Sequence, residues 1–405
     1  MDNFTKEIEN IKINTETAID QFLAFAQKNN AAVAIYRLPN DSRLQIICDL
    51  EGGSIVEDFN LDDLSTGFLL HPFQEGEKSI VHFNAEILAE INIQSNHKNH
   101  SKSEIKWNNT PDESLVKEIF ENSEKFNFSL LQHNGISDSI SSEGYISMVE
   151  NAIKEIKNNT FYKVVPAKTK NIEYNNSIDL GKAFLKAAHK YPNAFVSLTF
   201  SENTGLWFGA SPETLIEEKK GDYFKTMALA GTQAIEDKSI AETTWTQKEI
   251  EEQAYVSRYI INCFKKIRLR DFDELGPKTV QAGNLLHLKT TFKVDTKSVH
   301  FPELGSVMLK LLHPTSAVCG MPKDTSLKFI LEKEKHDRAY FSGFLGPIHL
   351  NEMSHLFVNL RCCQIDNEKV TFYAGAGITE DSKPEKEWHE TEMKCKVLSA
   401  VVFGK

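Results

Sequence analysis

Apolar and polar residues are arranged along the chain in patterns that predict both strands and helices. The stretches AAVAIYRLP (31–39) and RLQIICDL (43–50) are rich in apolar and β-branched residues and flank an Asn-Asp turn signal, which predicts a hairpin. Another strand-like stretch, IVHFNAEILAEINI, follows at 80–93. The segment 94–114 is almost entirely polar and is expected to be a long exposed loop or linker.

After this segment, helical spacing and strand-like runs occur together. SEGYISMVENAIKEIKNN (142–159) has apolar residues at helical spacing, with Ser142 as its expected cap, and FYKVV (161–165) predicts a strand. Further strands are expected at AFVSLTF, SHLFVNLRCCQI and KVTFYAGAGI, and further helices at IDLGKAFLKAAHK, TQKEIEEQAYVSRYIINCFKKI and EKEWHETEMKCKVLSAVV. Neighbouring strands without a helix between them indicate antiparallel pairing, so the expected fold class is α+β rather than doubly wound.

Composition is that of an ordinary globular protein. The 405 residues are 40% hydrophobic and 25% charged, which is enough for one large core or for two domains. With 57 acidic and 46 basic residues the formal net charge is −11, so the chain has no basic footprint for nucleic acid or an anionic membrane surface.

The chain also lacks the patterns of export and membrane insertion. The sequence contains no apolar run of about 20 residues, the length that spans a bilayer, and its charged start differs from a secretory signal. Six cysteines without a CxxC pair suggest reduced, buried thiols, and a cytoplasmic location is expected.

The segment YAGAGITEDSKPEKEWHETEMK (373–394) combines alternating glycines with a predicted helix rich in glutamate. Ser382, followed by proline and then by Glu385 three positions on, predicts a capping box at the helix start. Glu392 is expected at the surface. The glycines ahead of the helix would allow a close approach of the backbone to a ligand.

Two predicted helices carry pairs of glutamates on one face. Glu387, Glu390 and Lys394 are spaced i, i+3 and i+7, and Glu249 and Glu252 are spaced i and i+3 on another helix. Mg²⁺ takes oxygen ligands, keeps several waters and is commonly held by one or two carboxylates, so the two helices could converge on one such ion. The same spacing is typical of a solvated helix surface, and both interpretations are open.

Other polar residues stand where either chemistry or structure would explain them. Lys163 in FYKVVPAK is either an edge residue that faces solvent or an inward amine whose pKa burial would lower. Glu213, after the rigid Ser-Pro of WFGASPETL, is either presented to a site or lies in a surface turn. His313 could be a ligand or a hydrogen-bonded loop histidine. Arg361 and Arg338 could each bind a substrate carboxylate or close an internal salt bridge.

The order of these motifs along the chain resembles the chorismate-utilising enzymes. The resemblance rests on KVV, GASPE, ALAGT, KExxEQ, HPTSAVCGMP, RAYFSGFLG and LR, followed by YAGAGI and S-x-P-x-x-E-x-x-x-x-E-T-x-x-K. The family includes isochorismate synthases, salicylate synthases and the synthase subunits of anthranilate and aminodeoxychorismate formation. The matching motifs cover about residues 140–400, and the N-terminal third is similar only in length and character.

The resemblance implies a fold and a division of the chain. The implied fold is one large α+β domain of antiparallel sheets flanked by helices, similar to anthranilate synthase component I, around a Mg²⁺-dependent chorismate site. Residues 1–135 would form the less family-specific, sheet-rich N-terminal part, and residues 136–405 the chorismate-binding catalytic region.

The resemblance also implies roles for individual residues. Those that match the metal ligands are Glu252 and Glu390, with Glu249 and Glu387 close to the ion. Lys163 matches the general base and Glu213 the general acid. The residues that match groups around the substrate are Thr232, His313, Arg361, Gly375, Gly377 and Lys394.

Within the family, an isochorismate synthase, an isomerase, is the expected member. Lys163 indicates that water is the nucleophile rather than ammonia, and Ala230 stands where aminodeoxychorismate synthases carry a nucleophilic lysine. The Leu-Leu-Glu-Ser signature of anthranilate synthases under tryptophan feedback is absent from the N-terminal third. Salicylate synthase, which also eliminates pyruvate, is the alternative, and a non-catalytic chorismate-binding relative is a third hypothesis.

The chain departs from the family pattern in three places. Pro166 and Lys168 follow KVV where a small residue or leucine and an arginine are usual, and Gln253 replaces a histidine after Glu252. The proline could kink the strand and change the direction of Lys163.

The expected partner is the small molecule chorismate alone. A monomer is expected, without a glutamine amidotransferase subunit. The resemblance implies a product that feeds menaquinone or catechol siderophore synthesis, with menaquinone preferred.

Overall fold

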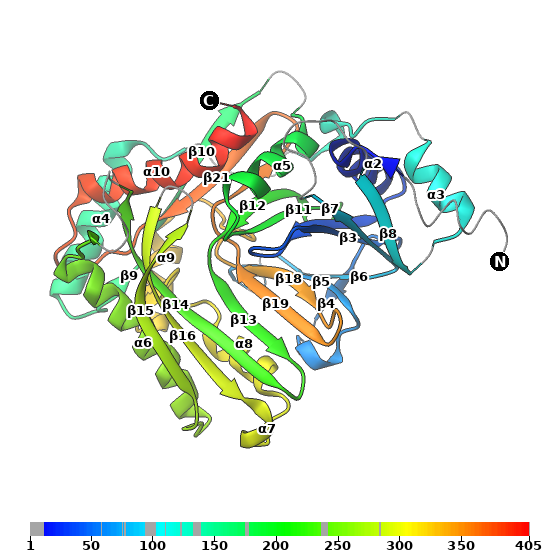
Figure 1. Cartoon of the computed structure of the whole chain (residues 1–405). Coiled ribbons are helices and arrows are strands. Elements are labelled where there is room, and N and C mark those ends of the chain that lie inside the picture. The colour runs from blue at the N-terminus through cyan, green and yellow to red at the C-terminus, as the bar shows by residue number, and fades with distance from the viewer. Residues whose placement is uncertain are drawn as a thin grey trace.

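The computed structural model describes residues 12–404, with gaps at 58, 75, 77, 94–102, 110, 122–123, 133–138, 175–177, 236–241 and 283–284. Within these residues, two large sheets and one short sheet form, and each ladder between neighbouring strands is antiparallel (Figure 1). The predicted α+β class is confirmed.

The first sheet joins strands from both ends of the chain. Its ten strands lie in the order β1 (Lys12–Ile13), β8 (Ser103–Asn109), β7 (Ile87–Asn92), β3 (Arg43–Asp49), β2 (Ala32–Arg37), β11 (Phe195–Ser201), β12 (Gly205–Ser211), β20 (Cys362–Ile365), β21 (Lys369–Gly375) and β10 (Ala167–Glu173). Because β2 pairs with β11, this sheet crosses the predicted division at residue 135, and that division stays a prediction about family resemblance.

The second sheet is built mainly from the C-terminal part of the chain. Its nine strands lie in the order β15 (Asp273–Ala282), β16 (Leu285–Asp295), β14 (Tyr223–Ala234), β13 (Thr214–Lys219), β19 (Met353–Val358), β18 (Phe344–Ile348), β5 (Gly67–His71), β6 (Ile80–Asn84) and β4 (Ser54–Val56). The short sheet pairs β9 (Lys163–Val164) with β17 (Gly320–Met321).

Helices cover the outer faces of the sheets. They are α2 (Thr15–Lys28), α3 (Glu113–Phe120), α4 (Ser142–Lys157), α5 (Leu180–Lys190), α6 (Gln247–Lys266), α7 (Thr296–Val299), α8 (Leu304–Leu312), α9 (Lys323–Lys333) and α10 (Pro384–Val402), with short 3-10 turns η1 (Leu61–Asp63) and η2 (Phe128–Leu130). Among the described residues, none of these helices is both long and apolar enough to cross a bilayer.

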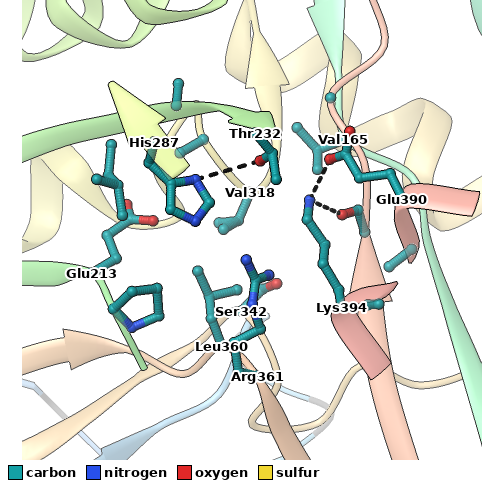
Figure 2. Close-up of a pocket in the computed structure, with 18 of the residues that line it drawn as sticks. Val165, Glu213, Thr232, His287, Val318, Ser342, Leu360, Arg361, Glu390 and Lys394 are labelled. Atoms are coloured by element: carbon teal, nitrogen blue, oxygen red, sulfur yellow. Dashed lines mark hydrogen bonds and ion pairs between the residues drawn. The ribbon is translucent and has the colours of Figure 1, made fainter. Parts of the chain in front are cut away.

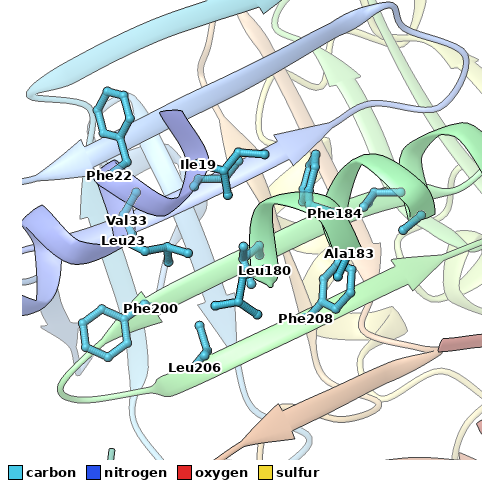
Figure 3. Packing of buried hydrophobic residues seen from close by; sticks show 14 of the residues in the cluster. Ile19, Phe22, Leu23, Val33, Leu180, Ala183, Phe184, Phe200, Leu206 and Phe208 are labelled. Carbon is cyan, nitrogen blue, oxygen red and sulfur yellow. The ribbon is translucent and has the colours of Figure 1, made fainter. Parts of the chain in front are cut away.

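One hydrophobic core lies between the first sheet and its helices. Phe22 of α2 is fully buried beside Trp107 of β8, and Phe184 of α5 is fully buried beside Phe208 of β12 (Figure 3). Burying a phenylalanine side chain contributes about 1.5–3 kcal/mol, so this layer stabilises the scaffold on which the site is built. A second core packs α4, α6, α8 and α9 against the other sheet.

Several local predictions are settled by these elements. The hairpin at 31–50 is confirmed as β2 and β3. The prediction of a continuous loop at 94–114 is wrong in part, because Ser103–Asn109 forms β8; residues 94–102 and 110 lie outside the described part of the chain. Helix α4 begins at Ser142, but its cap is the preceding Ser141, whose side chain accepts from the Gly144 amide.

The predicted capping box at Ser382 is also wrong. Helix α10 begins at Pro384 and its N-cap is Lys383, which makes no side-chain capping bond. The hydroxyl of Ser382 accepts instead from the amide of Thr379, 3.1 Å away, and so closes the preceding turn.

The strand predicted at 161–165 is interrupted soon after Lys163. β9 ends at Val164, and the chain re-enters a sheet only at Ala167, where β10 begins beside β21. Pro166 lies in this break because it has no amide hydrogen to donate to a ladder. Lys163 therefore lies on β9 in the short sheet, paired with Met321 of β17, rather than in either large sheet.

Candidate functional site

One pocket gathers most of the site residues predicted from the sequence. Those that line it are Lys163, Glu213, Thr232, Glu252, Arg361, Gly375, Gly377, Glu390 and Lys394. Figure 2 shows Glu213 and His287 on one side of this pocket, Glu390 and Lys394 on the other, and Arg361 between them. These residues come from distant parts of the chain, so the fold itself assembles the pocket.

Lys163 enters the pocket from β9. Its residue surface is 1% exposed, so the interpretation as a solvent-facing edge residue is wrong and the inward amine is what the structure has. The Nζ atom lies 3.4 Å from Oε1 of Glu252 on α6, a longer contact than a well-formed charged hydrogen bond. The amine is therefore close to a carboxylate but not tightly held by it.

Glu213 follows β12 and the Ser211-Pro212 turn. Its residue surface is 3% exposed, and its amide donates to the hydroxyl of Ser211 at 3.3 Å. Burial raises the pKa of Glu213 from 4.5 to about 8, although the positive charges of Lys163, Arg361 and Lys394 act in the opposite direction. At neutral pH this carboxyl is mostly protonated and can donate a proton.

His287 of β16 also lines the pocket, and it was not among the site residues predicted from the sequence. Its Nδ1 lies 2.8 Å from the carbonyl oxygen of Gly231, which can only accept, so Nδ1 carries the proton. Burial, followed by the charge of Arg361, lowers the pKa of His287 to about 3. The ring is thus neutral, and its buried Nε2 has no hydrogen-bond partner among the described residues.

A signal for His287 was present in the sequence. It stands within the apolar run LLHL, where a polar side chain needs a hydrogen-bond partner or a ligand. The alternation of residues along this strand could not show that the face carrying His287 lines a pocket.

Helix α10 brings Glu390 and Lys394 to the pocket on one face, as their spacing predicted. Nζ of Lys394 lies 2.7 Å from Oε1 of Glu390 and donates to the carbonyl oxygen of Gly375 at 2.7 Å. Burial alone would raise the pKa of Glu390, but the charges of Lys394 and Lys248 bring it below its ordinary value. Glu390 is therefore held ionised.

Glu387 lies on the same helix but does not line the pocket wall. Its residue surface is 2% exposed, and its Oε1 lies 2.6 Å from Nζ of Lys248 on α6. Its Oε2 is buried without a hydrogen-bond partner among the described residues. Burial raises the pKa of Glu387, Lys248 opposes this shift, and the neighbouring charge of Glu390 adds to it.

A metal ion would find oxygen ligands here, but not a preformed cage. Among the described residues, no group of three or more His, Cys, Asp or Glu side chains is close enough to hold an ion by itself. Each of the carboxylates of Glu252, Glu387 and Glu390 instead faces a lysine. The unpartnered Oε2 of Glu387 and the all-oxygen donor set suit a hard divalent cation that keeps several waters.

Glu249 has a structural partner at the start of α6. Its Oε2 accepts from the amide of Thr246 at 2.9 Å, and the two residues complete a capping box. In this structure the Glu249 carboxylate therefore accepts a hydrogen bond at the start of the helix. Its predicted place near a metal ion is not tested by this contact and stays a prediction.

His313 does not line the pocket, contrary to its predicted place in the cavity wall. Its Nε2 lies 3.0 Å from the carbonyl oxygen of Pro72, and its ring packs against those of His71 and Phe344. His71 belongs to β5 and Phe344 to β18, so the ring packs on these two strands rather than in the pocket wall. The alternative of a hydrogen-bonded loop histidine describes it.

The two candidate arginines have different surroundings. Arg338 also lines the pocket, but it forms an ion pair with Glu334, so its internal salt-bridge interpretation is the one seen. Arg361 lines the pocket, and its guanidinium makes no hydrogen bond or ion pair with the residues that the structure describes. Its backbone φ is 49°, a conformation uncommon for residues other than glycine, and burial lowers its pKa to about 10. The guanidinium is free to take an anion.

Gly377 shows why this wall needs glycine. A Cβ atom added there would lie 1.8 Å from Oε1 of Glu252 and 3.0 Å from Cε of Lys163. The predicted close approach of the backbone is therefore used to seat two charged side chains of the pocket, and any larger residue would displace them.

The family profile described as "Chorismate binding enzyme" matches residues 73–403. The chain is 30% identical over 199 residues to the vibriobactin-specific isochorismate synthase of Vibrio cholerae, which covers 47% of this chain and 49% of the relative. It is 27% identical over 248 residues to isochorismate synthase EntC of Escherichia coli, covering 60% and 62%. The chain thus matches about half and about three-fifths of the lengths of these two relatives.

The fold is shared with a solved relative. The menaquinone-specific isochorismate synthase MenF of Escherichia coli aligns over 97% of this chain and 94% of its own, with a TM-score of 0.71 and 19% identity. At 19% identity, the structural similarity shows that the two proteins share a fold. Family membership rests instead on the family profile, which spans most of the sequence. The chain belongs to the family of chorismate-binding enzymes.

Proposed function

We propose that this protein is an isochorismate synthase, an isomerase that converts chorismate to isochorismate. The observation that supports the proposal most directly is the pairing, in one pocket, of the buried amine of Lys163 with Glu213, whose pKa is raised to about 8. The reaction needs one group that accepts a proton and one that donates a proton at the same pH.

The reaction moves a hydroxyl group between two ring carbons. The amine of Lys163 takes a proton from a water whose oxygen forms a bond to C2 of the ring. The double bonds shift, the C4–O bond breaks, and Glu213 gives its proton to the departing hydroxyl, which leaves as water. One water is consumed and one is released, and a proton then returns from Lys163 to Glu213.

The neutral imidazole of His287 suits a substrate that carries a hydroxyl group. Its Nε2 is an acceptor without a protein partner in the described structure, so it can take a hydrogen bond from a substrate hydroxyl or from the attacking water. Nε2 can accept a hydrogen bond only while the imidazole of His287 is neutral, and the lowered pKa of His287 keeps it neutral.

Chorismate carries two carboxylates, and the pocket has separate means to hold each. The guanidinium of Arg361, which has no partner within the described part of the chain, can bind one of them through two parallel hydrogen bonds. Glu252 and Glu390, with Glu387 behind them, would hold Mg²⁺, which when bound would neutralise the other carboxylate. Lys248 and Lys394 lie beside Glu387 and Glu390 and offset part of their negative charge.

Two features favour water over nitrogen nucleophiles. A lysine at position 163 can accept the proton of water, whereas ammonia needs no such base. Ala230 lines the pocket where a family member that uses a nucleophilic lysine would have that amine. Relatives named for menaquinone and for siderophore synthesis are both similar to this chain, so isochorismate is proposed to feed one of these two pathways.

The test is to incubate the purified protein with chorismate and MgCl₂ and to separate the products by chromatography. Isochorismate as the product supports the proposal. Salicylate together with pyruvate would instead identify the alternative, a salicylate synthase. Binding of chorismate without any product would indicate a non-catalytic relative and overturn the proposal.

A further inference from the structure

The break in the strand after Lys163 is held by an unusual set of bonds. Pro166 cannot donate a hydrogen bond, yet the peptide groups on both sides of it are satisfied. The amide of Val165 donates to the carbonyl of Cys319 at 2.9 Å, and the carbonyl of Pro166 accepts from the amide of Ala376 at 3.3 Å and from the hydroxyl of Tyr145 at 3.2 Å. The segment is kinked but fully bonded.

Two further bonds to this segment come from a buried ion pair rather than from a neighbouring strand. Oε1 of Glu334 accepts from the amide of Ala167 at 2.7 Å, just after the proline. Nη2 of Arg338 donates to the carbonyl of Val165 at 2.7 Å, just before it. Glu334 and Arg338 therefore form hydrogen bonds to the backbone on both sides of Pro166.

The two ions are bonded to each other at two points. Nε of Arg338 donates to Oε2 of Glu334 at 2.8 Å, and Nη2 donates to Oε1 at 2.5 Å. Both side chains are 3% exposed, and the guanidinium also lies 4.3 Å from the ring centroid of Phe73. A bidentate pair this deeply buried has a fixed geometry.

The same helix that ends at this ion pair also holds Lys163 itself. Glu334 is the C-cap of α9, and Ser326, earlier on α9, donates its hydroxyl to the carbonyl oxygen of Lys163 at 3.0 Å. The carbonyl group of Lys163 is thus bonded to α9. The backbone at 165–167 is bonded to the ion pair at the end of the same helix.

A buried ion pair does little for net stability, because the cost of removing two charges from water offsets their attraction. Its clearest use here is directional, since it supplies on both sides of Pro166 the bonds that a continuous strand would otherwise provide. We infer that Glu334, together with Arg338, is a positioning residue that aims the Lys163 amine into the pocket by fixing the kinked backbone at 165–167.

This inference rests on the proposed role of Lys163, and its test has a readout that does not. In Glu334→Gln the Ala167 amide keeps an acceptor, but one bond to Arg338 is lost and the charge of the pair is no longer balanced. The ε-¹³C NMR signal of Lys163, in protein labelled at its lysines and assigned by its loss in Lys163→Ala, is expected to shift or broaden. The matched control is Glu332→Gln, an exposed glutamate on the same helix, which should leave that signal unchanged.

Glu334→Gln should also change the kinetics of the proposed reaction. Displacing the amine should lower kcat about 10- to 100-fold while the KM for chorismate changes less than about twofold, because orientation affects the reacting step rather than binding. In a Lys163→Ala background, Glu334→Gln should cause no further loss. If Glu334→Gln is unfolded by circular dichroism, Ser326→Ala serves instead, with the same shift in the Lys163 signal expected.

An unchanged Lys163 signal in the folded variant would overturn the inference, as would a loss of activity that persists in the Lys163→Ala background. If the wild-type protein forms no isochorismate, the proposed function fails, while the NMR comparison still decides whether Glu334 positions Lys163.

Discussion

Nζ of Lys168 lies 3.7 Å from the ring centroid of Trp388, and the same ammonium is paired with the carboxylate of Glu392. Lys168 belongs to β10, whereas Trp388 and Glu392 belong to α10, the helix that carries Glu390 and Lys394. Glu392 is therefore not the surface residue that its sequence context predicted. The contact attaches α10 to β10, the strand that follows Lys163 and Pro166 in the chain.

Replacing Lys168 should loosen this attachment. The Lys168 side chain is 2% exposed, and removing one partner of a buried pair is costly, so Lys168→Ala is expected to lower the free energy of unfolding by about 3 kcal/mol. Lys168→Arg should retain most of it, since a guanidinium can stack on Trp388 and bind Glu392. Urea denaturation measures both. The control, Lys170→Ala, removes a pair whose lysine is 34% exposed and should cost about 1 kcal/mol or less.

Lys163→Ala should abolish water addition while the fold remains intact. Loss of a general base typically lowers the rate by about 10²- to 10⁴-fold, and chorismate turnover at saturating substrate measures it. Lys157→Ala, at the exposed end of α4, is the control and should retain the wild-type rate. A Lys163 variant with a near wild-type rate would remove this residue as the base.

Glu213 should give the protein a distinctive pH dependence. In the fold its pKa is about 8 against an ordinary 4.5, so between these values the unfolded chain is ionised while the folded protein keeps the proton. The contribution of this group to stability is therefore complete below pH 4.5 and declines as the pH rises toward 8. Turnover should likewise fall above about pH 8, as the acid loses its proton.

The variant Glu213→Gln tests both effects. It should lose about 10²-fold or more in turnover, yet gain stability at pH 8 by about 1–4 kcal/mol, since each unit of pKa shift corresponds to about 1.4 kcal/mol. Glu217→Gln is the opposite control. Burial of Glu217 is outweighed by bonds from Lys225 and Tyr223 that lower its pKa, so its removal should reduce stability at pH 8. Thermal unfolding at pH 5 and pH 8 separates the two, and equal behaviour would contradict the assignment.

Glu390→Gln should weaken the proposed response to Mg²⁺. Removing one carboxylate from an ion held by few protein ligands is expected to raise the Mg²⁺ concentration for half-maximal turnover by at least about tenfold. Calorimetric titration with MgCl₂ gives the same comparison without turnover. Glu385→Gln, an exposed position in the first turn of the same helix, should titrate like the wild type. Identical Mg²⁺ curves for Glu390→Gln and wild type would exclude Glu390 as a ligand.

Local pattern was sufficient for much of the architecture. Adjacent strand-like runs with turn signals predicted antiparallel pairing, and helical spacing predicted that Glu387, Glu390 and Lys394 share one face of α10. These features depend only on the periods of a strand and a helix, which neighbouring residues determine. The motif order along the chain was likewise sufficient to suggest the family before any contact was known.

Only the tertiary structure decided which of these side chains face the pocket and which have other partners. It turned Lys163 inward, brought His287 to the same cavity and left Arg361 without a partner among the described residues. It also gave Arg338, Glu249 and His313 bonding partners within the protein. The reason is physical: a strand or helix has a period but no preferred face until another element covers it. Burial, charge pairing and the resulting pKa shifts therefore arise from segments far apart in the chain, which local sequence does not bring together.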